Sequence, residues 1–69
     1  MDNIQENFLT QLVERNIPVT LFLVNGFQYR GVIRDFDKFT ISIEVEGNQF
    51  LIFKKMVSTI QTQSPVIAM

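Results

Sequence analysis

The 69-residue sequence contains no cysteine, no histidine and no tryptophan. Without cysteine it cannot form a disulfide, and without cysteine or histidine it lacks the usual ligands of a structural zinc ion. The same two absences remove the commonest general base and the best thiol nucleophile of enzymes. We therefore expect no bound metal, no cofactor and no enzymatic activity.

Strong net charge and long apolar runs are absent as well. Six basic and seven acidic residues give a net charge of −1, so total charge alone does not predict a nucleic-acid binder. No apolar stretch approaches the ~20 residues that a membrane helix needs, and the first residues, "MDNIQENF", lack the pattern of a secretion signal. These features predict a cytoplasmic protein without membrane contact.

A chain of this length is expected to form one domain, which buries only ~60% of the surface that its unfolded chain exposes. With no disulfide or zinc to add stability, self-association is the remaining route. Apolar residues occupy both faces in "TLFLV" and in "FLIF", whereas a small sheet with one wet face alternates strictly. We infer that a second copy covers part of the sheet through edge-strand pairing. If the pairing is head-to-tail and the rotation closes, the product is a subunit ring.

The hydrophobic pattern predicts one helix followed by five strands. Apolar residues recur with helical spacing from Asn3 to about Arg15. Asn3 and Glu6 fit a capping box at its start, and Asn16 followed by Pro18 ends it. The period then changes to two, and strands are predicted at "VTLFLV", "FQYRGVIRDF", "FTISIEV", "QFLIFKK" and "MVSTIQT".

Turn signals separate these strands. "NG", "DFDK" and "EGN" each predict a turn, and Asp35 and Asp37 fit turn positions better than a catalytic pair, because aspartate bonds its own backbone. Gly31 is a natural place for the sheet to bend. The predicted fold is mainly β with one N-terminal α-helix, a five-stranded, strongly bent antiparallel barrel. A single domain is expected over residues 1–69, with its helix at about 3–15, its barrel at about 19–62 and a short tail at 63–69.

Four motifs, "NIQENFL", "PVTLFLVNGFQYRGVI", "FDKFTISI" and "KKMVSTI", resemble in order and spacing the Hfq family of bacterial Sm-like RNA chaperones. The similarity runs from Asn3 to about Thr62, and "EVEGNQ" is similar to members from Gram-positive bacteria. The resemblance implies an Sm-like barrel, a ring of six identical subunits closed by strand pairing, and two RNA-binding faces. It also implies a role in regulation by small RNAs and mRNAs, with no enzymatic activity.

The resemblance implies that the pore-side face of the subunit ring takes U-rich RNA. The corresponding residues here are Gln5, Lys38, Phe39, Lys54 and Lys55. Phe39 would stack on uracil, Gln5 and Lys38 would hydrogen-bond the base or its neighbours, and the other two lysines would line the pore. An aromatic face stacks a base for ~1–3 kcal/mol, and lysines add a salt-sensitive attraction to phosphate. From the residues alone, a core position for Phe39 stays open.

The resemblance implies that the opposite face takes A-rich RNA. The matching residues are Phe22, Asn25, Gly26, Phe27, Gln28, Tyr29 and Arg30, with Gln49 and Thr59 as further contacts. Gly26 would let a nucleotide approach the backbone, the three aromatic residues would supply stacking or pocket walls, and Arg30 would meet a base or a phosphate. The sequence leaves core or interface packing open for Phe22 and Tyr29.

The sequence departs from the family pattern in three places. "FKK" at residues 53–55 stands where many relatives have Tyr-Lys-His. We expect the missing tyrosine hydroxyl to remove a hydrogen bond of ~1 kcal/mol between subunits, and lysine in place of histidine to make the salt dependence of U-rich binding steeper. "VERN" at residues 13–16 has a single arginine beside a glutamate where relatives carry an arginine patch. No long C-terminal extension follows the barrel. We expect reduced RNA-annealing activity, and none that depends on a disordered tail.

Other functions remain open at this point. Small five-stranded barrels also bind proline-rich peptides in aromatic grooves, although the lack of tryptophan argues against such an adaptor. A purely structural subunit ring is a second alternative, and RNA binding that survives substitution of Phe39 would favour it. An unspecific binder of single-stranded DNA is the third, and the 2′-hydroxyl distinguishes it when ribo- and deoxyribo-oligomers are compared.

Overall fold

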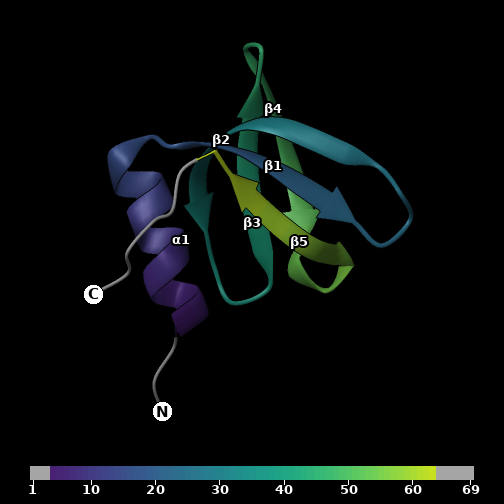
Figure 1. The fold of residues 1–69 in the computed structure, drawn as a ribbon, viewed down its shortest axis with the longest axis horizontal. Helices are drawn as coiled ribbons and strands as arrows, with labels where there is room; N and C mark the ends of the chain where they lie inside the picture. Colours follow the sequence, from purple (N-terminus) through teal and green to yellow (C-terminus); the bar gives the residue numbers. More distant parts are fainter. Residues whose placement is uncertain (1–3, 64–69) are drawn as a thin grey trace.

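The computed structural model describes the backbone of residues 4–63 and the side chains of residues 7–63. One helix precedes five antiparallel strands, which confirms the predicted fold class (Figure 1). The elements are α1 (Ile4–Arg15), β1 (Pro18–Leu23), β2 (Gln28–Phe36), β3 (Thr40–Val45), β4 (Asn48–Phe53), a 3-10 helix (Lys54–Met56) and β5 (Val57–Thr62). The capping contacts predicted for the side chains of Asn3 and Glu6, and the tail from residue 64, lie outside the described residues.

Helix α1 buries one apolar stripe against the sheet, where Leu9 and Leu12 are fully buried. The helix ends because Asn16 adopts the left-handed backbone conformation, with φ of 54°. The N–H of Ile17 then donates to the carbonyl of Leu12 at 3.1 Å, which satisfies a carbonyl in the last turn. The prediction that Asn16 ends the helix is therefore confirmed.

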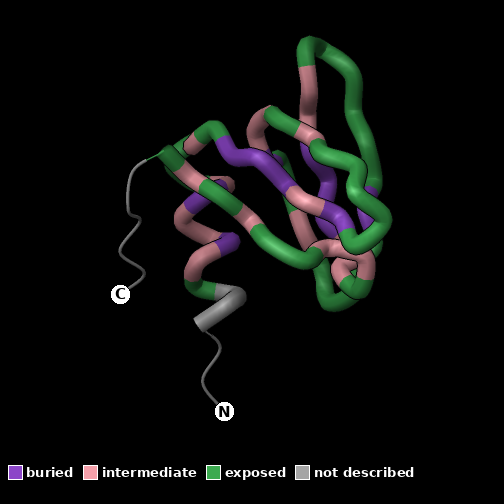
Figure 2. The backbone as a smooth tube through the Cα atoms, turned by 45° about the vertical axis from the view of Figure 1, so that its right-hand side comes forward, coloured by how far each residue is buried: buried purple, intermediate pink, exposed green. Residues whose placement is uncertain are grey.

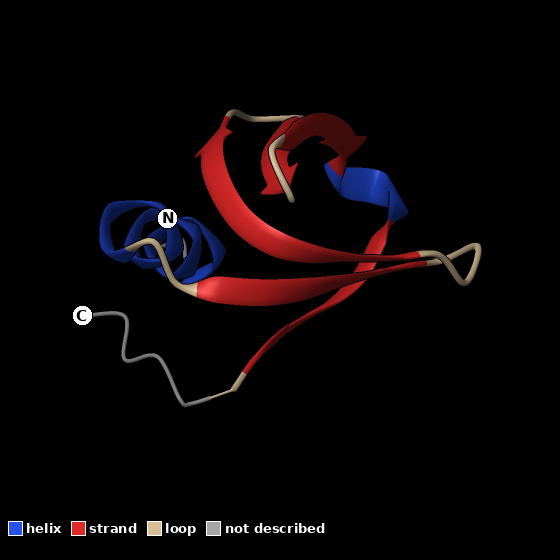
Figure 3. Cartoon of the chain, turned by 90° about the horizontal axis from the view of Figure 1, so that it is seen from above, coloured by secondary structure: helices blue, strands red, loops and turns tan. Residues whose placement is uncertain are grey.

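The five strands form one sheet in the order β4-β3-β2-β1-β5. Strand β2 has nine residues and curves strongly as it passes from its pairing with β1 to its pairing with β3 (Figure 3). Its register with β3 shifts between Ile33 and Asp35, so Arg34 is the extra residue of a bulge. Strands β4 and β5 are the two edges of the sheet, each with a single partner strand among the described residues.

Gly31 lies where β2 and β3 pass very close to each other. A Cβ atom at this position would clash with the carbonyl oxygen of Glu44 and lie 3.1 Å from Cγ2 of Val45. Only a residue without Cβ allows so close an approach of two backbones. The sequence predicted a bend at Gly31, and the structure shows a close approach of two strands there.

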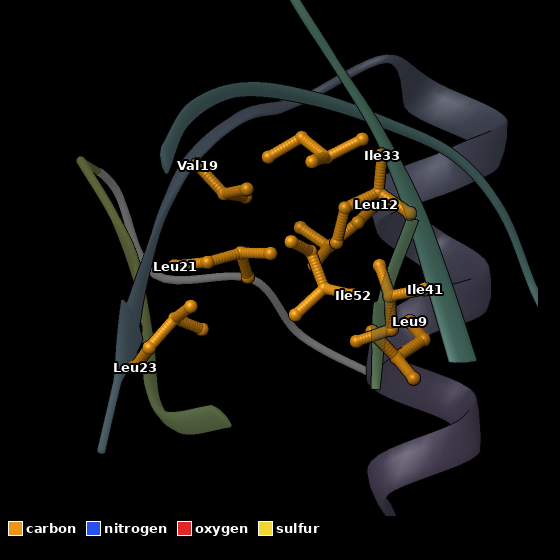
Figure 4. Close-up of a cluster of buried hydrophobic side chains, with 9 residues drawn as sticks. Leu9, Leu12, Val19, Leu21, Leu23, Ile33, Ile41 and Ile52 are labelled. Atoms are coloured by element: carbon orange, nitrogen blue, oxygen red, sulfur yellow. The ribbon is translucent and has the colours of Figure 1, made fainter. Parts of the chain in front are cut away.

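The core lies between α1 and the inner face of the sheet. Among residues 7–63 it contains nine buried aliphatic residues: Leu9, Leu12, Val19, Leu21, Leu23, Ile33, Ile41, Ile43 and Ile52. Figure 4 shows the side chains from β1 pointing toward those from α1 and the strands opposite. Buried backbone segments follow the inner side of the sheet, whereas the tips of the hairpins are exposed (Figure 2). In the described part of the chain, no helix has the length and apolar character needed to cross a membrane.

Four predicted strands are shorter in the structure, and the first is shifted by one residue. Phe27 precedes β2, and Met56 belongs to the 3-10 helix before β5. Phe39 precedes β3 instead of belonging to it, and Lys54 and Lys55 form the 3-10 helix after β4 instead of its last residues. The N–H of Lys54 donates to the carbonyl of Phe39 at 2.7 Å, a hydrogen bond in register with the pairing of β3 and β4. The consequence is that one aromatic and two cationic residues gather at one end of the sheet.

Candidate nucleic-acid interface

All three lysines of the chain lie around one open pocket of about 460 Å³. We call it the pore-face pocket, after the face on which these residues were predicted to lie. It is lined by Lys38, Phe39, Phe53, Lys54 and Lys55. They come from the β2–β3 turn, the end of β4 and the 3-10 helix, which meet because Thr40 pairs with Phe53. The structure thus gathers four of the five residues predicted for the pore-side face. The side chain of the fifth, Gln5, lies outside the described residues.

The aromatic side chains of this pocket are open to solvent. Phe39 is 68% exposed and Phe53 is 56% exposed, so Phe39 is not a core residue. The Nζ of Lys38 lies 5.8 Å from the centroid of the Phe39 ring, and the Nζ of Lys54 lies 5.3 Å from that of Phe36. These distances are in the range of cation–π contacts. An exposed phenyl ring bordered by ammonium groups can stack a base and attract its phosphate.

Asp37 organises the turn that carries Lys38 and Phe39. Its Oδ1 accepts hydrogen bonds from the N–H of Phe39 at 2.8 Å, from the N–H of Thr40 at 2.7 Å and from the Thr40 hydroxyl at 2.9 Å. The N–H of Phe39, followed by these two donors of Thr40, lowers the pKa of the Asp37 carboxyl below its ordinary value. The turn role predicted for Asp37 is confirmed, whereas Asp35 lies within β2.

On the outward face of the sheet, Phe22 is flanked by two residues predicted with it. It pairs with Gln28 on β2 and with Thr59 on β5. Because directly opposed residues of an antiparallel pair share a face, these three side chains form one row. Phe22 is half-buried, while Gln28 and Thr59 are exposed. The row offers an aromatic edge between two hydrogen-bonding groups.

A second row runs beside the first and was only partly predicted. Thr20 pairs with Arg30 and with Gln61, and the Nε of Arg30 donates to Oγ1 of Thr20 at 3.4 Å. An open pocket of about 300 Å³ covers this row. It is lined by Pro18, Val19, Thr20, Arg30, Gln61, Thr62 and Gln63. Sequence reasoning missed Gln61, although its spacing of two from Thr59 places both on the same side of β5.

The turn between β1 and β2 presents the predicted glycine and phenylalanine. The N–H of Leu23 donates to the carbonyl of Phe27 at 2.9 Å, which closes a turn over residues 24–26. Gly26 occupies the left-handed region with φ of 95°, and no atom lies within 4 Å of where its Cβ would be. Oδ1 of Asn25 accepts from the N–H of Phe27 at 3.1 Å, and Phe27 is 63% exposed. The backbone at Gly26 is therefore open to a ligand.

Tyr29 and Gln49 lie apart from these rows. Tyr29 pairs with the buried Leu21, so it faces the inner side of the sheet, and its ring lies 5.0 Å from that of Phe50 at a tilt of 48°. Gln49 is on β4 and donates from Nε2 to Oγ of Ser42 at 2.7 Å. The structure thus brings together Phe22, Gln28 and Thr59, sets Arg30 beside them, and places these two residues elsewhere.

Arg34, in the β2 bulge, is a cation that sequence reasoning did not single out. Its Nε donates to Oε1 of Glu44 at 2.8 Å, and its Nη1 donates to Oδ1 of Asn16 at 2.8 Å. The pair with Glu44 is partly exposed, and such pairs contribute little to stability. The hydrogen bond to Asn16 ties the end of α1 to β2.

A helix in front of a strongly bent, five-stranded antiparallel sheet is the Sm-like fold. A crystal structure described as that of the pleiotropic translational regulator Hfq superimposes with a TM-score of 0.85 at 40% identity, covering 87% of this chain and all of that one (100%). YaeO from Vibrio cholerae, solved with magnesium, has a TM-score of 0.74 at 19% identity over 90% of this chain and 87% of its own. At that identity, YaeO supports the fold alone.

Sequence comparisons identify the family. The family model described as Hfq protein matches residues 4–67. Proteins named RNA-binding protein Hfq are 54% identical in Brevibacillus brevis over 67 residues (97% of this chain, 85% of the relative) and 53% identical in Halalkalibacterium halodurans over 64 residues (93% and 82%). The relative from Pelotomaculum thermopropionicum is 50% identical over 64 residues (93% and 77%). This chain belongs to the Hfq family, as its motifs predicted. The expectation that it is not an enzyme is confirmed as well.

Proposed function

We propose that this protein binds single-stranded RNA on two faces of a homo-oligomeric ring and supports regulation by small RNAs and mRNAs in the cytoplasm. The observation that carries the proposal is the gathering of all three lysines around the exposed ring of Phe39. A chain with net charge −1 thus has a local site with three cations. Repetition of this site around a subunit ring produces a basic face on an acidic protein.

The pore-face pocket is proposed to bind U-rich RNA. Phe39 stacks on uracil, and Lys38 and Gln5 hydrogen-bond the base or a neighbouring nucleotide. Lys54 and Lys55 attract phosphates from the 3-10 helix. The exposure of Phe39 supports the stacking role, because a base needs an uncovered aromatic face.

The outward face is proposed to bind A-rich RNA. Phe22 supplies an aromatic contact, Gln28 and Thr59 bond base edges, and Arg30 meets a base or a phosphate. Asn25, Gly26 and Phe27 contact the nucleotide that passes over the β1–β2 turn. The open space above Gly26 supports a close approach to the backbone. Tyr29 and Gln49 belong to the proposed set through the family resemblance alone, because Tyr29 faces the inner side of the sheet against Phe50 and Gln49 lies apart on β4.

Subunits are proposed to join by pairing β4 of one copy with β5 of the next. Both strands are sheet edges in the described chain, and an unpaired edge is a template for another strand. Strand β4 also exposes large apolar side chains, with Leu51 at 65% and Phe53 at 56% exposure. Head-to-tail pairing of two different edges repeats until the ring closes. The resemblance to the Hfq family sets the proposed number of subunits at six.

The annealing of two RNAs at the outer rim is proposed to be weak. The stretch at residues 13–16 carries Glu14 next to Arg15, and an acidic neighbour reduces the attraction to phosphate. Arg34, the additional cation near this stretch, donates to the carboxylate of Glu44. The rim therefore offers less uncompensated positive charge than the pore-face pocket does.

Titration of the full chain with short labelled U-rich and A-rich RNAs, by fluorescence anisotropy at one near-physiological salt concentration, tests this proposal. Binding of both RNAs by a particle with the mass of a multimer is the expected result. Binding of neither RNA would leave a structural ring or an adaptor. Equal binding of deoxyribo-oligomers of the same sequence would indicate an unspecific single-strand binder.

A further inference from the structure

Both backbone polar groups of Phe39 are held by hydrogen bonds. Its N–H donates to Oδ1 of Asp37 at 2.8 Å, and its carbonyl accepts from the N–H of Lys54 at 2.7 Å. The ring itself is 68% exposed, so packing of the side chain does little to fix it. The position of this aromatic ring consequently depends on its backbone, in a turn outside the regular pairing of β2 and β3.

Asp37 closes that turn with both its side chain and its backbone N–H. Its Oδ1 accepts from the N–H of Phe39 and from the N–H and hydroxyl of Thr40, at distances between 2.7 and 2.9 Å. Its own N–H donates to the carbonyl of Thr40 at 2.9 Å. Lys38 and Phe39 are therefore the two residues enclosed by a loop that one aspartate ties together.

We propose that Asp37 is the positioning residue of the pore-face pocket, because its Oδ1 fixes the turn in the conformation that presents the Phe39 ring for stacking. It acts through Phe39 and Lys38 and makes no contact with RNA. This inference rests on the proposed RNA binding of the pore-face pocket. It adds to that proposal the residue on which the geometry of the stacking surface depends.

Positioning by Asp37 requires an oxygen acceptor at the right place and does not require a charge. The charge of Lys54 contributes to lowering the pKa of Asp37, which means that the carboxylate lies within the electrostatic reach of that lysine. A negative charge there opposes the attraction between the lysine and a phosphate. An uncharged side chain with the same acceptor oxygen should therefore preserve U-rich binding or strengthen it.

Three substitutions of Asp37 separate the effect of its acceptor oxygen from the effect of its charge. Asp37→Asn keeps Oδ1 and removes the charge, Asp37→Glu keeps the charge and moves the oxygen by one methylene group, and Asp37→Ala removes both. Asp35→Ala is the matched control, since Asp35 is a nearby exposed aspartate whose Oδ1 accepts from the N–H of Phe36 and bonds neither Phe39 nor Thr40. Only a positioning role predicts that Asp37→Glu, which keeps the charge, weakens U-rich binding while Asp37→Asn, which removes it, preserves that binding.

The test is an anisotropy titration of the wild-type full chain and these four variants with U-rich and A-rich RNA at one salt concentration, with urea unfolding as a check on folding. Asp37→Ala and Asp37→Glu are expected to weaken U-rich binding by about tenfold or more, the scale of a lost stacking contact. Asp37→Asn and Asp35→Ala should stay within about threefold of the wild type or bind more tightly, and A-rich binding should change less than about threefold throughout.

Wild-type U-rich binding by Asp37→Ala, or an equal loss in Asp37→Asn and Asp37→Glu, would overturn the positioning role. An equal loss of both RNAs would also overturn it, because a general structural defect affects both faces. If Asp37→Ala does not fold, the difference in U-rich binding between Asp37→Asn and Asp37→Glu is sufficient to test the positioning role. Absence of U-rich binding by the wild type would instead overturn the proposed function of this pocket, so the two failures are distinguishable.

Discussion

The N–H of Lys54 donates a hydrogen bond to the carbonyl of Phe39 at 2.7 Å. This bond joins the turn after β2 to the 3-10 helix after β4, two segments well separated along the sequence. It places the exposed phenyl ring and the two adjacent lysines, Lys54 and Lys55, on one pocket. The fold thus brings Lys54 and Lys55 to the proposed U-rich site, whereas Lys38 is adjacent to Phe39 in the sequence.

Replacement of Phe39 by alanine removes the proposed stacking surface. U-rich binding should weaken by about 1–3 kcal/mol, measured as the change in dissociation constant by anisotropy, while A-rich binding stays the same. Because the side chain is 68% exposed, the free energy of unfolding should change little. Phe27→Ala, which removes an exposed phenylalanine from the β1–β2 turn, is the control and should weaken only A-rich binding. Loss of U-rich binding in both variants would contradict the assignment of separate faces.

Replacement of Lys55 by histidine tests the charge of the pore-face pocket. At pH 8 a histidine of ordinary pKa is neutral, so one cation per subunit is lost. The slope of log K against log salt for U-rich RNA should become shallower by about 0.7 for each phosphate contact that is lost. A titration series over several salt concentrations measures this slope. Equal slopes for wild type and Lys55→His would show that Lys55 contacts no phosphate.

Insertion of a Cβ at Gly31 should destabilise the barrel. Gly31→Ala would clash with the carbonyl of Glu44 on β3, and overpacking against backbone is expected to lower the free energy of unfolding by about 3 kcal/mol or more. Gly47→Ala is the matched control, because no atom lies within 4 Å of its Cβ position and only its φ of 85° disfavours alanine, by about 1 kcal/mol. Urea unfolding measures both, and equal losses would contradict a steric role for Gly31.

The fold follows largely from patterns that the sequence displays directly. The helical spacing of Leu9 and Leu12 and the period of two in the strands report which face of each element is buried, and burial dominates the choice of structure. Asn16 signalled the helix end because it tolerates the left-handed conformation found there. The end of β4 was predicted too late in the chain, because Lys54 and Lys55 form a 3-10 helix that the alternation of the strand does not signal.

The candidate site was predictable only in part, because some of its residues meet through long-range pairing of strands. The resemblance pointed to Lys38, Phe39 and the later lysines, and the fold gathers them. Thr20 and Gln61 were missed, because the register between the first and last strands is set by long-range pairing that no local pattern records. Asp37 was predicted as a turn residue, but its three donors are known only from the folded turn.

The lowered pKa of Asp37 predicts a loss of stability in acid. The N–H of Phe39 and both donors of Thr40 favour the carboxylate, so the folded pKa lies below the ordinary value of 3.8. A depressed folded pKa means that the contribution to stability is fully present above the unfolded pKa and is lost as the pH falls through the folded pKa. Urea unfolding of wild type and Asp37→Asn should differ by a constant amount from pH 7 to about pH 5, with wild type losing its relative stability below about pH 4. A difference that does not vary with pH would contradict the role of the charge.

A competition measurement decides whether one assembly holds U-rich and A-rich RNA on separate faces. A labelled U-rich RNA is bound to the protein near saturation, and unlabelled A-rich RNA is then added in excess at constant salt. The anisotropy is expected to stay high or to rise, since A-rich RNA binds elsewhere and enlarges the complex, whereas unlabelled U-rich RNA releases the label. Release of the label by A-rich RNA as effectively as by U-rich RNA would contradict the claim and place both RNAs on one shared site.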